Sequence, residues 1–241
     1  IATVCIILCK IIGLIYIIPF NAMISKSAGA LYSYAYNIYV IFLSLSTSGI
    51  PIAISKTVSE YNSMEYYNTK EREYKVGMKI ICLLGLISFV VMVVFADGIA
   101  ALILGDANGS NSVSDVAGVI RVISLALLIV PALSVTKGYL QGHKFITPTS
   151  ISQIIEQVVR VIVILLGSYL ALNVFNSDMK TAVGIAVSGA FFGAVAAYIF
   201  LRTKLKKSKI LKEKVAEDAG VSKREICKKI SCYGRVRRSG K

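Results

Sequence analysis

The sequence predicts an all-α, polytopic membrane protein with six transmembrane helices. Hydrophobic residues make up 56% of its 241 residues, and the mean hydropathy is +0.71. A soluble domain of this size cannot bury so much apolar surface. The apolar residues gather into six long runs, and none of the runs shows the period-two alternation of a barrel strand. Helices are therefore the predicted spanning elements.

Each run is long enough to cross the membrane, because about 20 helical residues span the ~30 Å hydrocarbon layer. The first run contains Lys10 and lacks a small-residue cleavage site, so it is interpreted as a span and not as a signal peptide. Pro51 and Pro131 lie late in the second and fourth runs and should bend them, either as hinges or as static kinks. In the sixth run, Gly189 and Gly193 of "GAFFG" predict close approach of a neighbouring helix. The predicted spans are residues 2–20, 33–55, 77–96, 117–136, 150–172 and 181–201.

The connectors alternate in charge along the chain. Connector 56–76 carries three lysines and one arginine and connector 137–149 carries two lysines, whereas connector 97–116 carries aspartates and no cation. Residues 202–241 hold 15 of the 27 basic residues and 4 of the 13 acidic ones. The positive-inside rule places the basic connectors, the N-terminus and this tail in the cytoplasm. We thus expect a six-helix unit over 1–201 in the cell membrane and a basic cytoplasmic tail over 202–241.

Several ionisable residues lie inside the predicted spans, where each costs about 2.5–3.5 kcal/mol at the bilayer centre. Lys10 is in mid-span with no acidic residue in helical reach, which favours a place facing a cavity. Glu156 and Arg160 are four residues apart and should form a structural pair on one helix face. Lys56 and Arg121 lie near span ends, where they either snorkel or face the same cavity. Cations in a bundle suit an anionic substrate, and the candidate substrate-binding residues are Lys10, Lys56, Arg121 and Arg160.

The motif content argues against catalysis and nucleic-acid binding. The sequence contains no HExxH, GxSxG or Walker motif and no paired carboxylates, so we expect no enzyme. The five cysteines find no histidine or cysteine partners at zinc-site spacing, so no metal or other cofactor is expected. The basic tail has no interleaved aromatic residues apart from Tyr233, which disfavours binding to nucleic acid.

Four segments in order resemble one transporter family. The segment "KGYLQGHKFITPTSISQIIEQVVRV" (137–161) resembles the helix 4–5 region of stage V sporulation protein B and lipid II flippase-like transporters. These belong to the multidrug/oligosaccharidyl-lipid/polysaccharide (MOP) exporter superfamily. The segment "LYSYAYNIYVIFLSLSTSGIPIAISKTVSEYN" (31–62) is similar to the second helix of that family, and "CKIIGLIYIIPF" (9–20) to its first. "VIRVISLALLIVPALSV" (119–135) also fits, and the resemblance covers about residues 1–212.

The resemblance implies a fold of two helical lobes around a central cavity that opens alternately to either membrane face. By this resemblance, the chain would form one lobe and act in polysaccharide biosynthesis, with membrane lipids and a second lobe as partners. The implied substrate is a lipid-linked oligosaccharide or peptidoglycan precursor, whose pyrophosphate head group would meet the cavity cations. Lys10 stands where such transporters often carry a cation. Gly138 and Gly142 are expected to let the chain leave the fourth helix, and Pro148 suits the first turn of the fifth.

The chain departs from the family pattern in two places. Relatives commonly read Tyr-Arg-Ile-Pro where this chain has Tyr16-Ile17-Ile18-Pro19, so one expected cavity arginine is missing. Where a relative would continue into a seventh helix, "SCYGRVRRSGK" is polar and basic, and we expect a truncated or frame-shifted end. Two alternatives to a flippase lobe therefore stay open. One is a lobe of a cation-coupled multidrug exporter, and the other is a non-transporting membrane remnant or interaction module.

Overall fold

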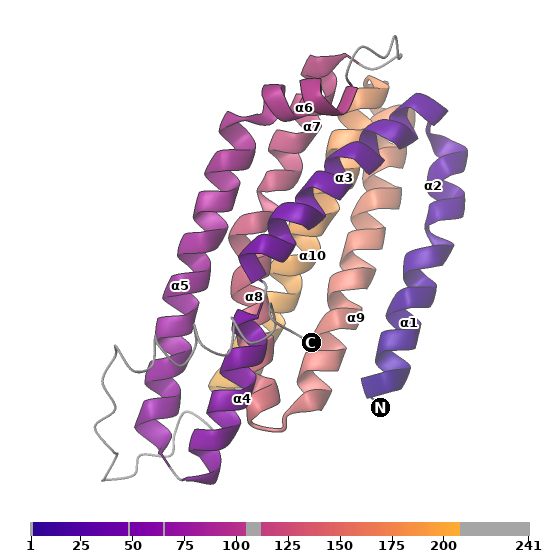
Figure 1. The fold of residues 1–241 in the computed structure, drawn as a ribbon. Helices are drawn as coiled ribbons and strands as arrows, with labels where there is room; N and C mark the ends of the chain where they lie inside the picture. The colour runs from indigo at the N-terminus through magenta and orange to yellow at the C-terminus, as the bar shows by residue number, and fades with distance from the viewer. Residues whose placement is uncertain (1, 48, 65, 105–111, 208–241) are drawn as a thin grey trace, which may run out of the picture.

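The computed structural model describes residues 2–47, 49–64, 66–104 and 112–207, and all the elements within these ranges are helices. Six of its helical stretches are long and apolar enough to cross a membrane, which confirms the six predicted spans. They stand side by side in one bundle, with α5 along one edge and α1 along the other (Figure 1). The stretches are Thr3–Met23, Lys26–Ser63, Asn68–Val94, Val113–Gly142, Ile146–Val174 and Met179–Lys206.

Most spans contain more than one helical element. The first three spans consist of α1 (Ala2–Ile15), α2 (Ile17–Met23), α3 (Lys26–Thr47), α4 (Ile50–Ser63) and α5 (Tyr67–Val94). A short helix, α6 (Ala96–Leu104), follows in the connector predicted over 97–116. The last three spans consist of α7 (Val113–Ser124), α8 (Ala126–Gly142), α9 (Ile146–Ile162), the π-helical η1 (Val163–Gly167) and η2 (Leu170–Val174), and α10 (Met179–Lys207).

The second span breaks between α3 and α4 instead of bending as one helix. Gly49 has a φ of 83°, a left-handed value that glycine adopts readily, and Pro51 lies in the first turn of α4. The proline therefore begins a new helix here, where its missing N–H leaves no gap. The α4 helix then continues to Ser63, because side chains such as Val58 are buried against the bundle. Most of the connector expected over 56–76 is thus helical.

Pro131 lies inside α8, so the carbonyl of Leu127 one turn earlier receives no intrahelical hydrogen bond from it. The α5 helix packs closely here. A Cβ atom on Gly85 would lie 2.6 Å from the oxygen of Leu127 and 3.1 Å from Cγ of Pro131. The span continues through Leu125, which joins α7 to α8 with a helical φ and ψ of −55° and −30°. A hinge motion at Pro131 stays a prediction.

Gly138 and Gly142 have a different role from the one expected. Both belong to α8, and the chain leaves the helix only at His143 and at Lys144, whose φ is 61°. A Cβ atom on Gly138 would lie 2.4 Å from the oxygen of Pro51, and one on Gly142 would lie 2.7 Å from the oxygen of Ser55. The two glycines therefore allow α8 to pack directly against the backbone of α4.

We expect Gly138→Ala to destabilise the protein by about 2 kcal/mol, because the steric cost of overpacking (about 1–3 kcal/mol or more) exceeds alanine's helix-propensity gain of about 1 kcal/mol. The atom that the new methyl group meets is a backbone oxygen, which cannot rotate away. Gly118→Ala in α7 is the matched control, since its Cβ would meet nothing within 4 Å. Thermal unfolding in detergent measures both variants, and equal melting temperatures would contradict the role assigned to Gly138.

The last span, α10, continues as a helix to Lys207, so the first six residues of the predicted tail 202–241 extend the span. Residues 208–241 lie outside the described part of the chain, and the prediction of a basic tail there is not tested.

Within the described residues, most buried apolar side chains belong to two clusters. One contains Phe20, Tyr39 and Ile120, and the other contains Ile54, Ile81 and Tyr139.

Candidate substrate groove

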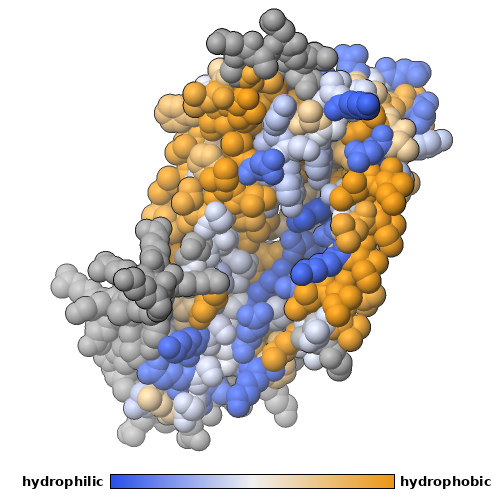
Figure 2. All heavy atoms as spheres, turned by 45° about the vertical axis from the view of Figure 1, so that its right-hand side comes forward, coloured by the Kyte–Doolittle hydropathy of each residue, from blue (hydrophilic) through white to orange (hydrophobic). Residues whose placement is uncertain are grey.

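A pocket of about 410 Å³ lies between α1, α3 and α9. It contains charged, amide and phenolic side chains. Figure 2 shows hydrophilic residues following a hollow along one face of the molecule, with apolar surface on both sides. The residues that line the pocket are Cys9, Lys10, Gly13, Leu14, Tyr16, Tyr32, Tyr36, Gln157 and Arg160. We refer to these nine residues as the groove.

The α9 helix supplies the charged residues next to the groove. Glu156 Oε1 accepts a hydrogen bond from Arg160 Nη2 at 3.2 Å, which confirms the pair predicted from their spacing. The other carboxylate oxygen accepts from Lys137 Nζ on α8 at 2.8 Å. All three side chains are about one-sixth exposed, so the pairs are only partly solvated. One carboxylate therefore joins cations from two helices.

The two glycines of "GAFFG" pack α10 against the backbone of α9 at the ion pair. A Cβ atom on Gly193 would lie 2.5 Å from the oxygen of Glu156, and one on Gly189 would lie 3.0 Å from the oxygen of Arg160. The backbone of α10 can therefore approach the two residues that carry the ion pair, as the sequence predicted. This contact fixes the turn of α9 that bears Glu156 and Arg160.

Lys10 and Arg160 reach the groove from different helices. Lys10 is exposed on α1, one turn before Gly13, whose Cβ would lie 3.1 Å from Nε2 of Gln157 on α9. This close approach brings α1 against α9 and places Lys10 in the same pocket as Arg160. Within the described residues, Nε of Arg160 is buried without a hydrogen-bond partner. The groove thus contains one exposed ammonium and one guanidinium with an unused donor.

Tyrosines form the third wall of the groove, and sequence reasoning missed them. Tyr32 and Tyr36 lie one turn apart on α3, with ring centroids 5.9 Å apart and ring planes 7° from parallel. Tyr16, at the junction of α1 and α2, also lines the pocket. The spacing of four between Tyr32 and Tyr36 is the signal that the sequence offered, because it puts both rings on one helix face.

The structure does not bring the other two predicted cations into the groove. Arg121 on α7 donates to Asp97 on α6 at 2.6 Å, and both side chains are about half exposed. Lys56 is exposed on α4 and does not line the pocket. Of the four candidate cations, only Lys10 and Arg160 share a site, and substrate contact by any of them stays a prediction.

A second polar cluster is buried where α4, α5 and α8 meet. Thr57 donates to Glu73, and the hydroxyls of Tyr74 and Thr136 are 3.2 Å apart. His143 follows α8 and packs edge-on against Tyr139, with ring centroids 4.6 Å apart. Neither of its ring nitrogens has a hydrogen-bond partner in the described part of the chain. Burial, with a further contribution from Lys70, lowers the pKa of His143 to about 4.

This lowered pKa predicts an acid-sensitive fold. The folded state disfavours protonation of His143, so the stabilisation is complete above the unfolded pKa of about 6.5 and is lost as the pH falls towards 4. The loss amounts to about 3 kcal/mol at most. His143→Phe keeps the ring contact with Tyr139 but removes the titration. We expect the wild type to lose more thermal stability than this variant between pH 7.5 and pH 4.5, and parallel curves would contradict the prediction.

Comparison with known proteins identifies the family to which the chain belongs. The model of the family described as "Polysaccharide biosynthesis protein" matches residues 1–220. The chain belongs to this family. The match covers all six spans and therefore includes every groove residue.

Two curated relatives come from Bacillus subtilis (strain 168). Lipid II flippase MurJ is 42% identical over 196 residues, which are 79% of this chain and 36% of the relative. Stage V sporulation protein B is 24% identical over 205 residues, 83% of this chain and 37% of the relative. The chain thus spans little more than a third of the length of these relatives.

Solved structures confirm the predicted fold class. A MOP superfamily transporter from Pyrococcus furiosus matches with a TM-score of 0.70 and 13% identity, covering 96% of this chain and 49% of that protein. A multidrug resistance MATE family transporter of the same superfamily gives a TM-score of 0.67 at 13% identity, with 94% and 48% covered. The six spans therefore have the fold of one lobe of a MOP transporter, about half of such a protein.

Proposed function

We propose that the chain forms one lobe of a transporter that moves a lipid-linked oligosaccharide or peptidoglycan precursor across the cell membrane. The observation that carries the proposal is that Lys10 and Arg160 line the same groove, together with three tyrosines. Family membership and the likeness to a lipid II flippase support the same substrate class. The groove lies within the membrane spans. A charged head group can enter this apolar region only if polar side chains bind it there.

The groove residues suit the two chemical parts of such a head group. Guanidinium and ammonium groups bind phosphate oxygens through charge-assisted hydrogen bonds, and Arg160 and Lys10 bring one of each to the groove. The stacked rings of Tyr32 and Tyr36 offer flat apolar faces and hydroxyl groups to a sugar. Glu156 offsets part of the positive charge, so the site stays stable when it is empty.

We infer that transport requires a second lobe in addition to this one. The matched MOP structures are about twice as long, so we infer that a second lobe completes the cavity.

A multidrug exporter lobe is the alternative function. A cationic drug would need an uncompensated carboxylate, whereas the carboxylate beside the groove, Glu156, is already shared by two cations. The basic groove therefore favours an anionic substrate.

We also infer that the N-terminus and the basic tail face the cytoplasm, because the positive connectors favour that side. In a variant without native cysteines, Ser63→Cys should react with a membrane-impermeant thiol reagent only after the cells are opened. Asp178→Cys should react in intact cells. Both positions are exposed and lie at opposite ends of the bundle, Ser63 after α4 and Asp178 before α10. Labelling of Ser63→Cys from outside would reverse the proposed topology.

The proposed function is tested in two stages. The purified full chain should bind a fluorescent polyprenyl diphosphate saccharide more tightly than the matching neutral polyprenol, and Arg160→Ala should reduce this difference. The chain is then reconstituted in vesicles together with the C-terminal part of a flippase relative, and transfer of the fluorescent head group between leaflets is measured. Equal binding of charged and neutral lipid, with no transfer in the completed form, would overturn the proposal.

A further inference from the structure

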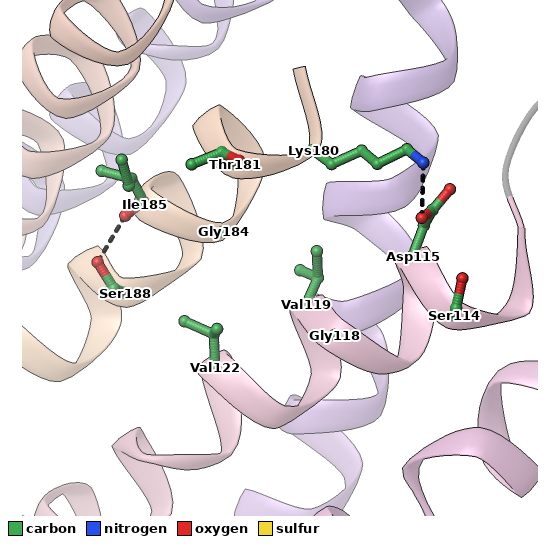
Figure 3. Close-up of a pocket in the computed structure, with 10 residues that line it drawn as sticks. All are labelled: Ser114, Asp115, Gly118, Val119, Val122, Lys180, Thr181, Gly184, Ile185 and Ser188. Atoms are coloured by element: carbon green, nitrogen blue, oxygen red, sulfur yellow. Dashed lines mark hydrogen bonds and ion pairs between the residues drawn. The ribbon is translucent and has the colours of Figure 1, made fainter. Parts of the chain in front are cut away.

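A second pocket opens between α7 and α10 and shares no lining residue with the groove (Figure 3). Its volume is about 470 Å³, within the range of about 300–1,000 Å³ typical of ligand sites. It lies in the first turns of two membrane spans, near the end of the bundle that carries α6. The lining residues are Ser114, Asp115, Gly118, Val119, Val122, Lys180, Thr181, Gly184, Ile185 and Ser188. We name these ten residues the furrow.

The walls of the furrow are apolar and built around two glycines. A Cβ atom on Gly118 or on Gly184 would meet nothing within 4 Å, so both residues border open space. Figure 3 shows Val119 and Val122 on the side of α7 that faces α10. Ile185 lines the furrow from α10. Water gains little in such a cavity within a bilayer, because the apolar walls offer few hydrogen-bond partners. The occupant that the membrane supplies is a hydrocarbon chain.

The mouth of the furrow carries one charge of each sign. Lys180 Nζ lies 2.8 Å from Asp115 Oδ1, and the two side chains are 60% and 10% exposed. Asp115 is also held by the cap of α7, where its carboxylate accepts from the backbone N–H of Ser112 at 3.2 Å. The carboxylate is therefore fixed, while the exposed ammonium keeps donors that point to solvent or to a head group. An exposed hydroxyl stands beside each charge, on Ser114 and on Thr181.

We propose that the furrow binds one membrane phospholipid with a zwitterionic, amine-bearing head group. The lipid phosphate lies on Lys180, its ammonium lies on Asp115, and one acyl chain follows the wall from Val119 to Val122. A purely anionic head group would also reach Lys180, but it would draw this ammonium away from Asp115 and bring no cation in its place. The complementary pair of charges therefore selects a zwitterionic lipid over an anionic one. This inference is independent of the proposed transport activity.

The test measures lipid retention by the purified full chain. Native mass spectrometry compares phosphatidylethanolamine with phosphatidylglycerol of the same acyl composition, and the wild type should retain one phosphatidylethanolamine in preference. Lys180→Gln removes one charge-assisted contact and should weaken phosphatidylethanolamine binding about tenfold. Binding of diacylglycerol, which has no head-group charge, should not change. Lys180 is largely exposed, so this variant is expected to fold.

A second pair of variants tests the acyl-chain wall. Gly184→Leu fills the furrow and should reduce retention of every diacyl lipid at least fivefold. Gly98→Leu on α6 is the matched control, because that glycine also borders open space but lies outside the furrow. Equal retention of both phospholipids by the wild type would overturn the proposal, and so would unchanged binding in Lys180→Gln and Gly184→Leu. A change of oligomeric state in Gly184→Leu without loss of lipid would instead assign the furrow to a second protein chain.

Discussion

Replacing Glu156 with glutamine is expected to lower the free energy of unfolding by about 3 kcal/mol. Breaking a buried ion pair from one side costs about 3–5 kcal/mol, because the remaining charge loses its partner, and exposed pairs cost about 1 kcal/mol or less. Glu156 has two partners, Lys137 at 2.8 Å and Arg160 at 3.2 Å, and its side chain is 17% exposed. The substitution leaves both cations facing each other in a poorly solvated site. Thermal unfolding in detergent should show a large fall in melting temperature.

A double-mutant cycle separates this ionic effect from a packing effect. Lys137→Met keeps the length and apolar stem of the lysine but removes its charge. If the charges are responsible, Glu156→Gln should cost clearly less when Lys137 is already methionine, because one of the two stranded cations is gone. Glu71→Gln provides a comparison with an exposed pair, since Glu71 contacts Lys75 within α5 and both are well solvated. A cost for Glu156→Gln as small as that for Glu71→Gln would contradict the bridging role.

The features that could be predicted from the sequence are those that depend on the residue pattern within one helix. The six apolar runs correspond to the six spans, because crossing a bilayer requires a continuous length of apolar residues. The Glu156–Arg160 pair follows from their spacing of four. The small residues of "GAFFG" also identified a real contact, with the backbone of α10 against α9. Each of these signals is local and has one structural interpretation.

Contacts between distant segments could not be predicted in this way. Lys137 is the first residue of the predicted connector 137–149, whereas in the structure it belongs to α8 and reaches Glu156 on α9. The sequence predicts Gly138 as a helix-terminating residue, whereas in the structure it lies inside α8 against Pro51. A glycine that ends a helix and one that accepts a neighbouring backbone look the same in a single sequence. The π-helical turns η1 and η2 also have no residue signature that distinguishes them from α-helix.

Replacing Lys10 with alanine is expected to reduce transport of a lipid-linked diphosphate by about 10- to 100-fold in the form completed with a second lobe. A hydrogen bond to a charged group contributes about 1.5–3 kcal/mol, and each 1.4 kcal/mol is a factor of ten. Lys10 is exposed in the groove and has no ion-pair partner among the described residues, so its loss leaves no stranded charge in the protein. Membrane insertion and melting temperature should therefore stay near the wild-type values.

The combination of lost transport and unchanged stability distinguishes Lys10 from Glu156. Lys10→Arg keeps the charge but presents it as a planar fork, so partial activity is expected. Lys26→Ala is the control for removing an exposed cation, because Lys26 begins α3 and does not line the groove. Full transport by Lys10→Ala would show that its ammonium does not contact the head group. The binding role would then rest on Arg160, the other cation that lines the groove.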